Sequence, residues 1–149
     1  MKKFIYLLML ALFFVTACSS KTEPTPAQID ANSNVKELQI IDLKVGDGHE
    51  ARTNFRVAVH YTGWLYDENA EDHKGKKFDS SFDRKRPFVF SLGNKDVIAG
   101  WDKGIVGMKM GGKRRLIIPP HMAYGAKGFP PVIPPNAALV FDIELLQAG

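Results

Sequence analysis

From about residue 36 onward, short stretches of alternating apolar and polar residues are separated by turn signals. In the clearest of them, residues 55–62, the apolar side chains are those of Phe55, Val57, Val59 and Tyr61. A period of two is typical of a strand that buries one face and exposes the other. Shorter segments follow the same pattern between glycine- and proline-rich turns. The strands that we expect are 38–43, 55–62, 88–90, 113–118 and 139–146.

One segment has the spacing of a helix. Val97, Ile98, Trp101 and Ile105 are separated by one, three and four residues, which predicts a helix from 97 to about 104 with one apolar face. A single short helix cannot provide the crossovers that several parallel strands require. The pattern therefore predicts the α+β class, with an antiparallel sheet and the helix packed on one of its faces.

The first residues differ from the rest of the chain. Lys2 and Lys3 precede an unbroken apolar run from residue 4 to residue 15. A run of this length fits the core of a signal peptide, and it is shorter than the roughly 20 residues of a membrane-spanning helix. The segment that ends the run, Val15-Thr16-Ala17-Cys18, resembles the lipobox of bacterial lipoproteins. We therefore expect a lipoprotein signal peptide over residues 1–17.

By this resemblance, Cys18 is acylated, for example with palmitate, and anchors the chain to a membrane through its lipid. The alternative is a secreted protein with one leftover thiol. Residues 18–34 are polar, contain prolines and lack periodicity, which predicts a flexible tether to one domain over residues 35–149. The expected location is the bacterial cell envelope. Ser19 favours the outer membrane in a cell with two membranes, since an aspartate there would resemble an inner-membrane retention signal.

Composition excludes several classes of protein. One cysteine excludes a disulfide framework within the chain and any zinc site with two thiolates. The net charge of +4 includes Lys2 and Lys3, so removal of residues 1–17, which contain no acids, leaves 18 bases against 16 acids. That balance does not predict a nucleic-acid partner. The four histidines are scattered, and we expect neither a metal nor a cofactor.

One segment imitates a phosphate-binding loop. Residues 107–113 match the first seven positions of a P-loop, but Arg114 stands where Ser or Thr would reach Mg²⁺. The segment also follows a helix instead of a strand, so its context is reversed. We interpret Gly111-Gly112 as a hairpin turn and Lys113-Arg114-Arg115 as the start of a strand with solvated charges. Residues 68–73 are interpreted as a solvated acidic loop.

Several aromatic residues lie beside turns, outside the regular alternation of the strands. Phe78 is followed by Asp79, Trp101 belongs to the helical stripe, and Tyr124 stands between Ala123 and Gly125. Asp79 and Tyr124 each add a polar group to apolar surroundings. This combination favours a small apolar pocket with a few orienting hydrogen bonds.

Seven short blocks, in order, resemble the FKBP-type peptidyl-prolyl isomerases over residues 36–147. Each block is weak evidence by itself, but the ordered set is specific. The blocks are His60-Tyr61-Thr62-Gly63, Lys77-Phe78-Asp79-Ser80-Ser81, Pro87-Phe88-x-Phe90, Val97-Ile98-x-Gly100-Trp101, Ala123-Tyr124-Gly125, Ile133-Pro134-Pro135 and Leu139-Val140-Phe141-Asp142. The resemblance implies an antiparallel sheet of about five strands curled around one short helix.

The resemblance also implies a site in which two groups of residues act on a bound proline. The residues expected to be catalytic are Asp79, Tyr124, Phe78 and Trp101, with Trp101 as the floor of the pocket. Those expected to bind substrate are Tyr61, Phe88, Val97, Ile98, Ile133 and Phe141. Asp79 has a second interpretation, as a loop carboxylate tied to Arg84 or Tyr61 for structure alone.

The implied activity is acceleration of rotation about X-Pro bonds in proteins outside the cytoplasmic membrane, without acid–base or covalent chemistry. Polypeptides that contain X-Pro bonds are the expected partners, and macrolides such as tacrolimus or rapamycin are expected inhibitors. A monomer is expected. Two alternatives remain: a module that binds proline-containing segments without isomerising them, and a purely structural lipoprotein.

Overall fold

The computed structural model describes residues 34–149 of the chain. The predicted signal peptide, Cys18 and all of the predicted tether except residue 34 lie outside the described residues. In the part of the chain that the structure describes, no helix is both long enough and apolar enough to cross a membrane.

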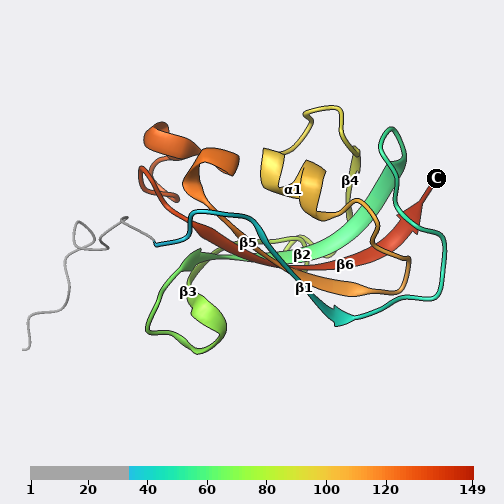
Figure 1. The fold of residues 1–149 in the computed structure, drawn as a ribbon, viewed down its shortest axis with the longest axis horizontal. Helices are drawn as coiled ribbons and strands as arrows, with labels where there is room; N and C mark the ends of the chain where they lie inside the picture. The colour runs from blue at the N-terminus through green and yellow to red at the C-terminus, as the bar shows by residue number, and fades with distance from the viewer. Residues whose placement is uncertain (1–33) are drawn as a thin grey trace, which may run out of the picture.

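Residues 34–149 form one antiparallel sheet of six strands and one short α-helix (Figure 1). The elements are β1 (Gln39–Lys44), β2 (Arg56–Tyr66), β3 (Lys74–Ser80), β4 (Phe88–Ser91), α1 (Ala99–Gly104), β5 (Lys113–Ile118) and β6 (Leu139–Ala148), with 3₁₀ turns η2 (Glu71–His73), η3 (Pro120–Met122) and η4 (Gly125–Lys127). The strand order is β1-β5-β6-β2-β3, and β4 pairs with the early part of β2. The α+β class and the antiparallel sheet are confirmed, with six strands instead of about five.

The additional strand is β3, which the sequence pattern does not reveal. It pairs with β2 along an edge of the sheet, and its register shifts twice, between Gly63 and Trp64 and between Trp64 and Tyr66. Each shift breaks the period of two that identifies a strand. Its first half is also rich in lysine, as edge strands often are.

The main core lies between the sheet and α1. Apolar residues of β2, β5 and β6 point toward the helix, and Trp101 and Ile105 of the helical segment pack onto them. Gly100 permits this close approach, because a Cβ atom there would lie 2.5 Å from Cγ2 of Ile118. The helix begins at Ala99, two residues later than the apolar stripe predicts. Figure 1 shows α1 over one face of the sheet.

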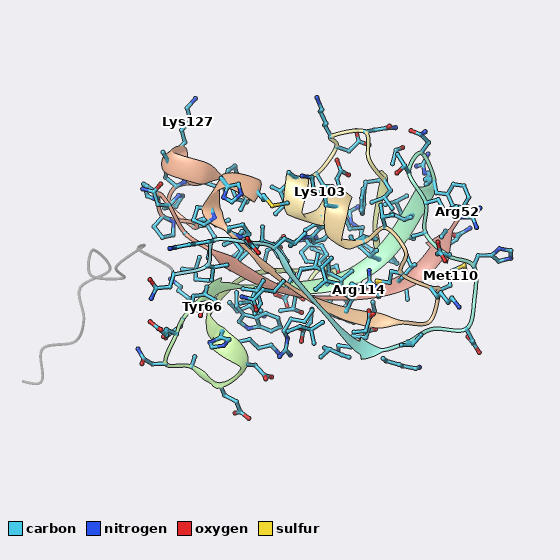
Figure 2. All side chains as sticks on the ribbon, in the orientation of Figure 1. Arg52, Tyr66, Lys103, Met110, Arg114 and Lys127 are labelled. Atoms are coloured by element: carbon cyan, nitrogen blue, oxygen red, sulfur yellow. The ribbon has the colours of Figure 1, made fainter. Side chains whose placement is uncertain are left out.

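The side chains of β5 correct the prediction that the charges of Lys113–Arg115 are solvated. Arg114 and Arg115 are each only 8% exposed, so their charges are not solvated. Arg114, which is labelled in Figure 2, donates hydrogen bonds to Asp42 and to the backbone carbonyl of Gly104. Arg115 donates to Asp142. Each guanidinium is buried because a carboxylate on the neighbouring strand compensates its charge.

The turn before β5 also differs from the prediction. Gly112 donates a backbone hydrogen bond to the carbonyl of Lys109 at 3.0 Å, and Gly111 has a φ of +80°. These residues do form a tight turn. However, the turn follows the α1 segment instead of joining two consecutive strands, so it is not a hairpin turn.

Candidate active site

A cavity of about 170 Å³ opens on the helix side of the sheet. Nine of the ten residues predicted to act on substrate surround it, together with Asp96, which the sequence reasoning missed. The lining residues are Tyr61, Phe78, Asp79, Phe88, Asp96, Val97, Ile98, Trp101, Tyr124 and Phe141. Residues from several segments between Tyr61 and Phe141 therefore come together around one cavity, as the resemblance implies.

Ile133 is the predicted site residue that does not line this cavity. Its side chain is 2% exposed and belongs to the main core. Its backbone bonds in both directions with Phe129, closing the loop beside the cavity. The structure thus places Ile133 in the core next to this loop, and its role in substrate binding stays a prediction.

Trp101 forms the floor of the cavity and is held by rings that meet it edge-on. The ring of Tyr61 lies 4.9 Å from that of Trp101 with an interplanar angle of 82°, and the ring of Phe141 lies 5.2 Å away at 87°. Phe88 approaches from β4 at 6.1 Å. Such edge-to-face contacts fix the orientation of each ring, so the walls of the cavity are already formed without a ligand.

Gly63 makes room for two of these walls. It pairs with Phe141 across the β2–β6 ladder and with Asp79 across the β2–β3 ladder. A Cβ atom at Gly63 would lie 2.6 Å from Cε1 of Phe141 and 2.7 Å from Cζ of Phe78. The absence of a side chain at this position lets both rings cover the strand.

Three polar side chains form a compact group at one wall. The hydroxyl of Tyr61 and the guanidinium of Arg84 both donate to the carboxylate of Asp79. Arg84 also donates to the Tyr61 hydroxyl oxygen at 2.7 Å. Asp79 is therefore bound to Tyr61 and Arg84, as its interpretation as a structural carboxylate requires, but it also lies on the cavity wall. The two roles are compatible.

The ionisation of this group follows from its contacts. Burial raises the pKa of Tyr61 to about 12, and the hydrogen bond to Asp79 adds to this effect. Burial also opposes ionisation of Asp79, but the hydrogen bonds from Tyr61 and Arg84 outweigh it and lower the pKa of Asp79. At neutral pH the wall thus holds a phenol, a carboxylate and a guanidinium.

Two serines fix the chain where β3 ends beside the cavity. Ser81 is fully buried, and its hydroxyl oxygen accepts the backbone N–H of Tyr61 at 2.8 Å. The hydroxyl of Ser80 donates to the backbone carbonyl of Tyr61 at 3.1 Å. These bonds hold the segment after Asp79 against β2, which directs Arg84 back toward the Asp79 carboxylate.

Two further polar groups are available at the cavity. Tyr124 precedes η4, is 38% exposed, and has a pKa raised by burial and by the charge of Asp79. Its hydroxyl is therefore a neutral donor at physiological pH. Ile98 is the N-cap of α1. The N–H of an N-cap residue has no partner within its helix, so it can serve a bound carbonyl.

Asp96 lies immediately before Val97 and Ile98 and was not predicted, because a single acidic residue in a loop carries no pattern. Within residues 34–149, no cluster of His, Cys, Asp and Glu side chains is grouped as a metal site would be. The site thus combines aromatic walls with a few orienting polar groups, which suits an apolar ring attached to a peptide backbone.

Known proteins share this architecture and sequence. Residues 48–146 match the FKBP-type peptidyl-prolyl cis-trans isomerase family. The chain is 54% identical over 110 residues to an FK506-binding protein of Neisseria meningitidis serogroup A, a match that covers 74% of this chain and 94% of that protein. It is 46% identical over 111 residues to the peptidyl-prolyl cis-trans isomerase Fkbp12 of Drosophila melanogaster, covering 74% and 96%.

Two crystal structures resemble the fold at similar levels of identity. AtFKBP13 superimposes with a TM-score of 0.66 at 41% identity, over 75% of this chain and 93% of that one. FkpA from Escherichia coli superimposes with a TM-score of 0.64 at 42% identity, over 74% of this chain and 47% of that one. The family match, these identities and the shared fold agree with the aromatic cavity above Trp101. The chain belongs to the FKBP-type peptidyl-prolyl cis-trans isomerases and has the isomerase activity of that family.

Proposed function

We propose that this isomerase acts on X-Pro bonds of polypeptides outside the cytoplasmic membrane, and that its cavity accelerates rotation by favouring a twisted amide. The mechanism is supported by the cavity above Trp101, whose lining consists mainly of aromatic rings and contains few polar groups. Its dimensions and lining suit a proline ring and the adjoining peptide bonds.

The energetic problem is resonance in the amide. Rotation about an X-Pro bond faces a barrier of roughly 20 kcal/mol, because the planar amide loses its resonance as it twists. The twisted amide is less polar than the planar one, so transfer from water to an apolar cavity favours it. The cavity then stabilises the transition state more than the ground state, which is the condition for catalysis.

The polar groups hold the bound peptide on one side of the X-Pro bond while the other side rotates about that bond. In this proposal the Tyr124 hydroxyl and the Ile98 amide donate to carbonyls of the bound chain and keep one flank fixed. The Asp79 carboxylate, oriented by Tyr61 and Arg84, faces the rotating amide. No proton is transferred and no covalent bond forms. A barrier lowered by about 5.5 kcal/mol would accelerate rotation about 10⁴-fold.

The direct test uses residues 34–149 and an X-Pro peptide, with cis–trans exchange followed by NMR. We expect fast exchange at catalytic protein concentrations. Peptide binding without faster exchange would contradict the mechanism and identify a binding module. All the residues that line the cavity lie within this segment.

Inhibition by a macrolide is part of the proposal. It is supported by relatives named FK506-binding proteins, one of which is 54% identical to the chain over 110 aligned residues. Tacrolimus or rapamycin should then abolish the exchange at stoichiometric concentration. Exchange that continues with the macrolide present would separate the catalytic cavity from the macrolide site.

Attachment to a membrane through Cys18 completes the proposal. It is supported by the apolar run of residues 4–15 and by the lipobox-like segment that ends at Cys18. Expression of the full chain with labelled palmitate in a bacterium should label the wild type, and Cys18→Ser should remove both the label and recovery in the membrane fraction. Equal labelling of the variant would refute the anchor and leave the isomerase intact.

A further inference from the structure

Asp96 occupies the mouth of the cavity in a fixed position. It lies in the loop between β4 and α1, lines the cavity and is exposed to solvent. Its Oδ2 atom accepts the backbone N–H of Ser91 at 3.1 Å. This bond ties the carboxylate to the end of β4. The charge of Asp96 therefore stays beside the opening.

The two carboxylates of the cavity differ in how their charges are balanced. The charge of Asp79 is compensated by Arg84, which contacts it directly. Among residues 34–149, no lysine or arginine lies within ion-pair distance of Asp96. The preceding residue, Lys95, forms no ion pair with Asp96 either. Its backbone N–H donates to the carboxylate of Asp102. The lining of the cavity thus carries one uncompensated negative charge at its mouth.

We propose that Asp96 determines substrate specificity, by favouring X-Pro segments that carry a lysine or arginine two residues before or one residue after the proline. This inference rests on the proposed action of the cavity on X-Pro bonds and adds a preference for a class of substrate. A cationic side chain of a bound segment would lie within the range of the Asp96 charge, which salt screens over about 8 Å at physiological ionic strength. An acidic side chain in the same place would be repelled.

The exposure of Asp96 limits the size of the effect. Exposed ion pairs contribute little in water, which corresponds to a difference in kcat/KM of about two- to five-fold between cationic and neutral peptides. Repulsion of an acidic peptide adds to the ratio of cationic to acidic substrates. Because solvent-exposed charges are screened, this ratio should approach one at high salt.

The test compares peptides that share one X-Pro core and carry Lys, Gln or Glu two residues before or one residue after the proline. Their kcat/KM values are measured by NMR exchange at low salt and at high salt. We expect a Lys-to-Glu ratio clearly above two at low salt for at least one placement. Asp96→Asn should bring this ratio close to one, since an asparagine oxygen can still accept the Ser91 N–H. Asp96→Lys should invert it.

A matched control removes an exposed acidic charge from another part of the chain. Glu71 lies in η2, between β2 and β3, outside the cavity lining. Glu71→Gln should leave the ratio at its wild-type value. A wild-type ratio of one at every placement, or a ratio that survives Asp96→Asn, overturns the inference. Each ratio compares two peptides on the same variant, so a loss of folded protein cancels. Turnover of the Gln peptide by the wild type shows that X-Pro bonds are isomerised even if the charge preference is absent. The two proposals can therefore fail separately.

Discussion

The hydroxyl of Tyr61 donates a hydrogen bond to the carboxylate of Asp79, although the two residues lie on different strands. Tyr61 belongs to the middle of β2 and Asp79 to the end of β3, and both line the cavity. The contact fixes the phenol and the carboxylate together, and Arg84 contacts both. The wall of the cavity is therefore held in place by contacts between side chains that themselves line the cavity.

Replacement of Asp79 by asparagine should reduce catalysis more than stability. The change keeps the size of the side chain but removes the charge that faces the rotating amide, and we expect kcat/KM to fall about ten-fold. The Asp79–Arg84 pair is about 40% exposed, so the free energy of unfolding should change by less than about 1 kcal/mol. NMR exchange and thermal unfolding measure the two effects. The control is Asp83→Asn, which breaks an exposed ion pair with Lys77 outside the cavity lining. If the folded Asp79→Asn variant kept full activity, Asp79 would have only a structural role.

Removal of the Tyr124 hydroxyl should also reduce turnover. Tyr124→Phe keeps the ring but loses one donor to the bound chain, a loss of about 0.5–1.5 kcal/mol that corresponds to about two- to ten-fold in kcat/KM. The matched control is Tyr66→Phe, because Tyr66 stacks with His73 and lies outside the cavity lining. Equal turnover in both variants would exclude the hydroxyl from the mechanism.

The rate should vary little with pH across the neutral range. The pKa of Asp79 is lowered, so its carboxylate stays charged above its ordinary value near 4, while the pKa of Tyr61 is about 12 and its phenol stays neutral. Between about pH 5.5 and pH 9, kcat/KM for an uncharged peptide should therefore change less than about two-fold. A bell-shaped profile centred near neutrality would point to proton transfer and contradict the mechanism.

Asp142 should be important for stability. Its carboxylate accepts two hydrogen bonds from Arg115, at 2.7 and 3.1 Å, and lies 2.8 Å from Nζ of Lys74. Its side chain is 10% exposed, as is that of Arg115. Asp142→Asn leaves Arg115 and Lys74 with only the half-exposed carboxylate of Asp72 as a charged partner. It should lower the free energy of unfolding by about 2–4 kcal/mol at pH 7. Urea unfolding checks this, and Asp83→Asn, at an exposed pair, should change it by less than about 1 kcal/mol.

The same residue sets the response to acid. Burial opposes ionisation of Asp142, but the hydrogen bonds of Arg115 and Lys74 outweigh it, so its pKa is lowered in the folded chain. The unfolded chain therefore binds a proton more readily than the folded one as the pH falls. The stabilisation is complete above the ordinary carboxyl pKa of about 4 and is lost below it. The difference in unfolding free energy between wild type and Asp142→Asn should shrink below that pH; a constant difference would contradict this account.

Gly63→Ala should damage both the fold and the site. The new Cβ atom would lie 2.6 Å from Phe141 and 2.7 Å from Phe78, so one or both rings must move. Overpacking of this kind costs about 1–3 kcal/mol. We also expect weaker macrolide binding, measured by calorimetry, because both rings line the cavity. Gly107→Ala tests strain alone: Gly107 has a φ of +81° and no atom within 4 Å of the added Cβ, so macrolide binding should not change.

The sequence pattern located most of the sheet but only part of its charge chemistry. The alternation is visible because one face of β2 is buried along its length, and one face of β6 is buried from Leu139 to Leu145. β3 escaped notice because its register shifts and its lysines hide the period of two. Arg115 was expected in solvent, since a charged residue in a strand does not reveal the carboxylate that pairs with it from the next strand.

By itself, the sequence determined the antiparallel class, the family and nine of the cavity residues, because alternation and ordered motifs are properties of the chain in one dimension. Only the tertiary structure decided that Tyr61, Asp79 and Arg84 touch and that Ile133 lies in the core. It also decided that Asp96 stands at the mouth of the cavity with no ion-pair partner among residues 34–149. The physical reason is that Tyr61 lies 18 residues from Asp79 and 23 residues from Arg84 along the chain. The register of β2 with β3, which the sequence pattern does not reveal, brings them together.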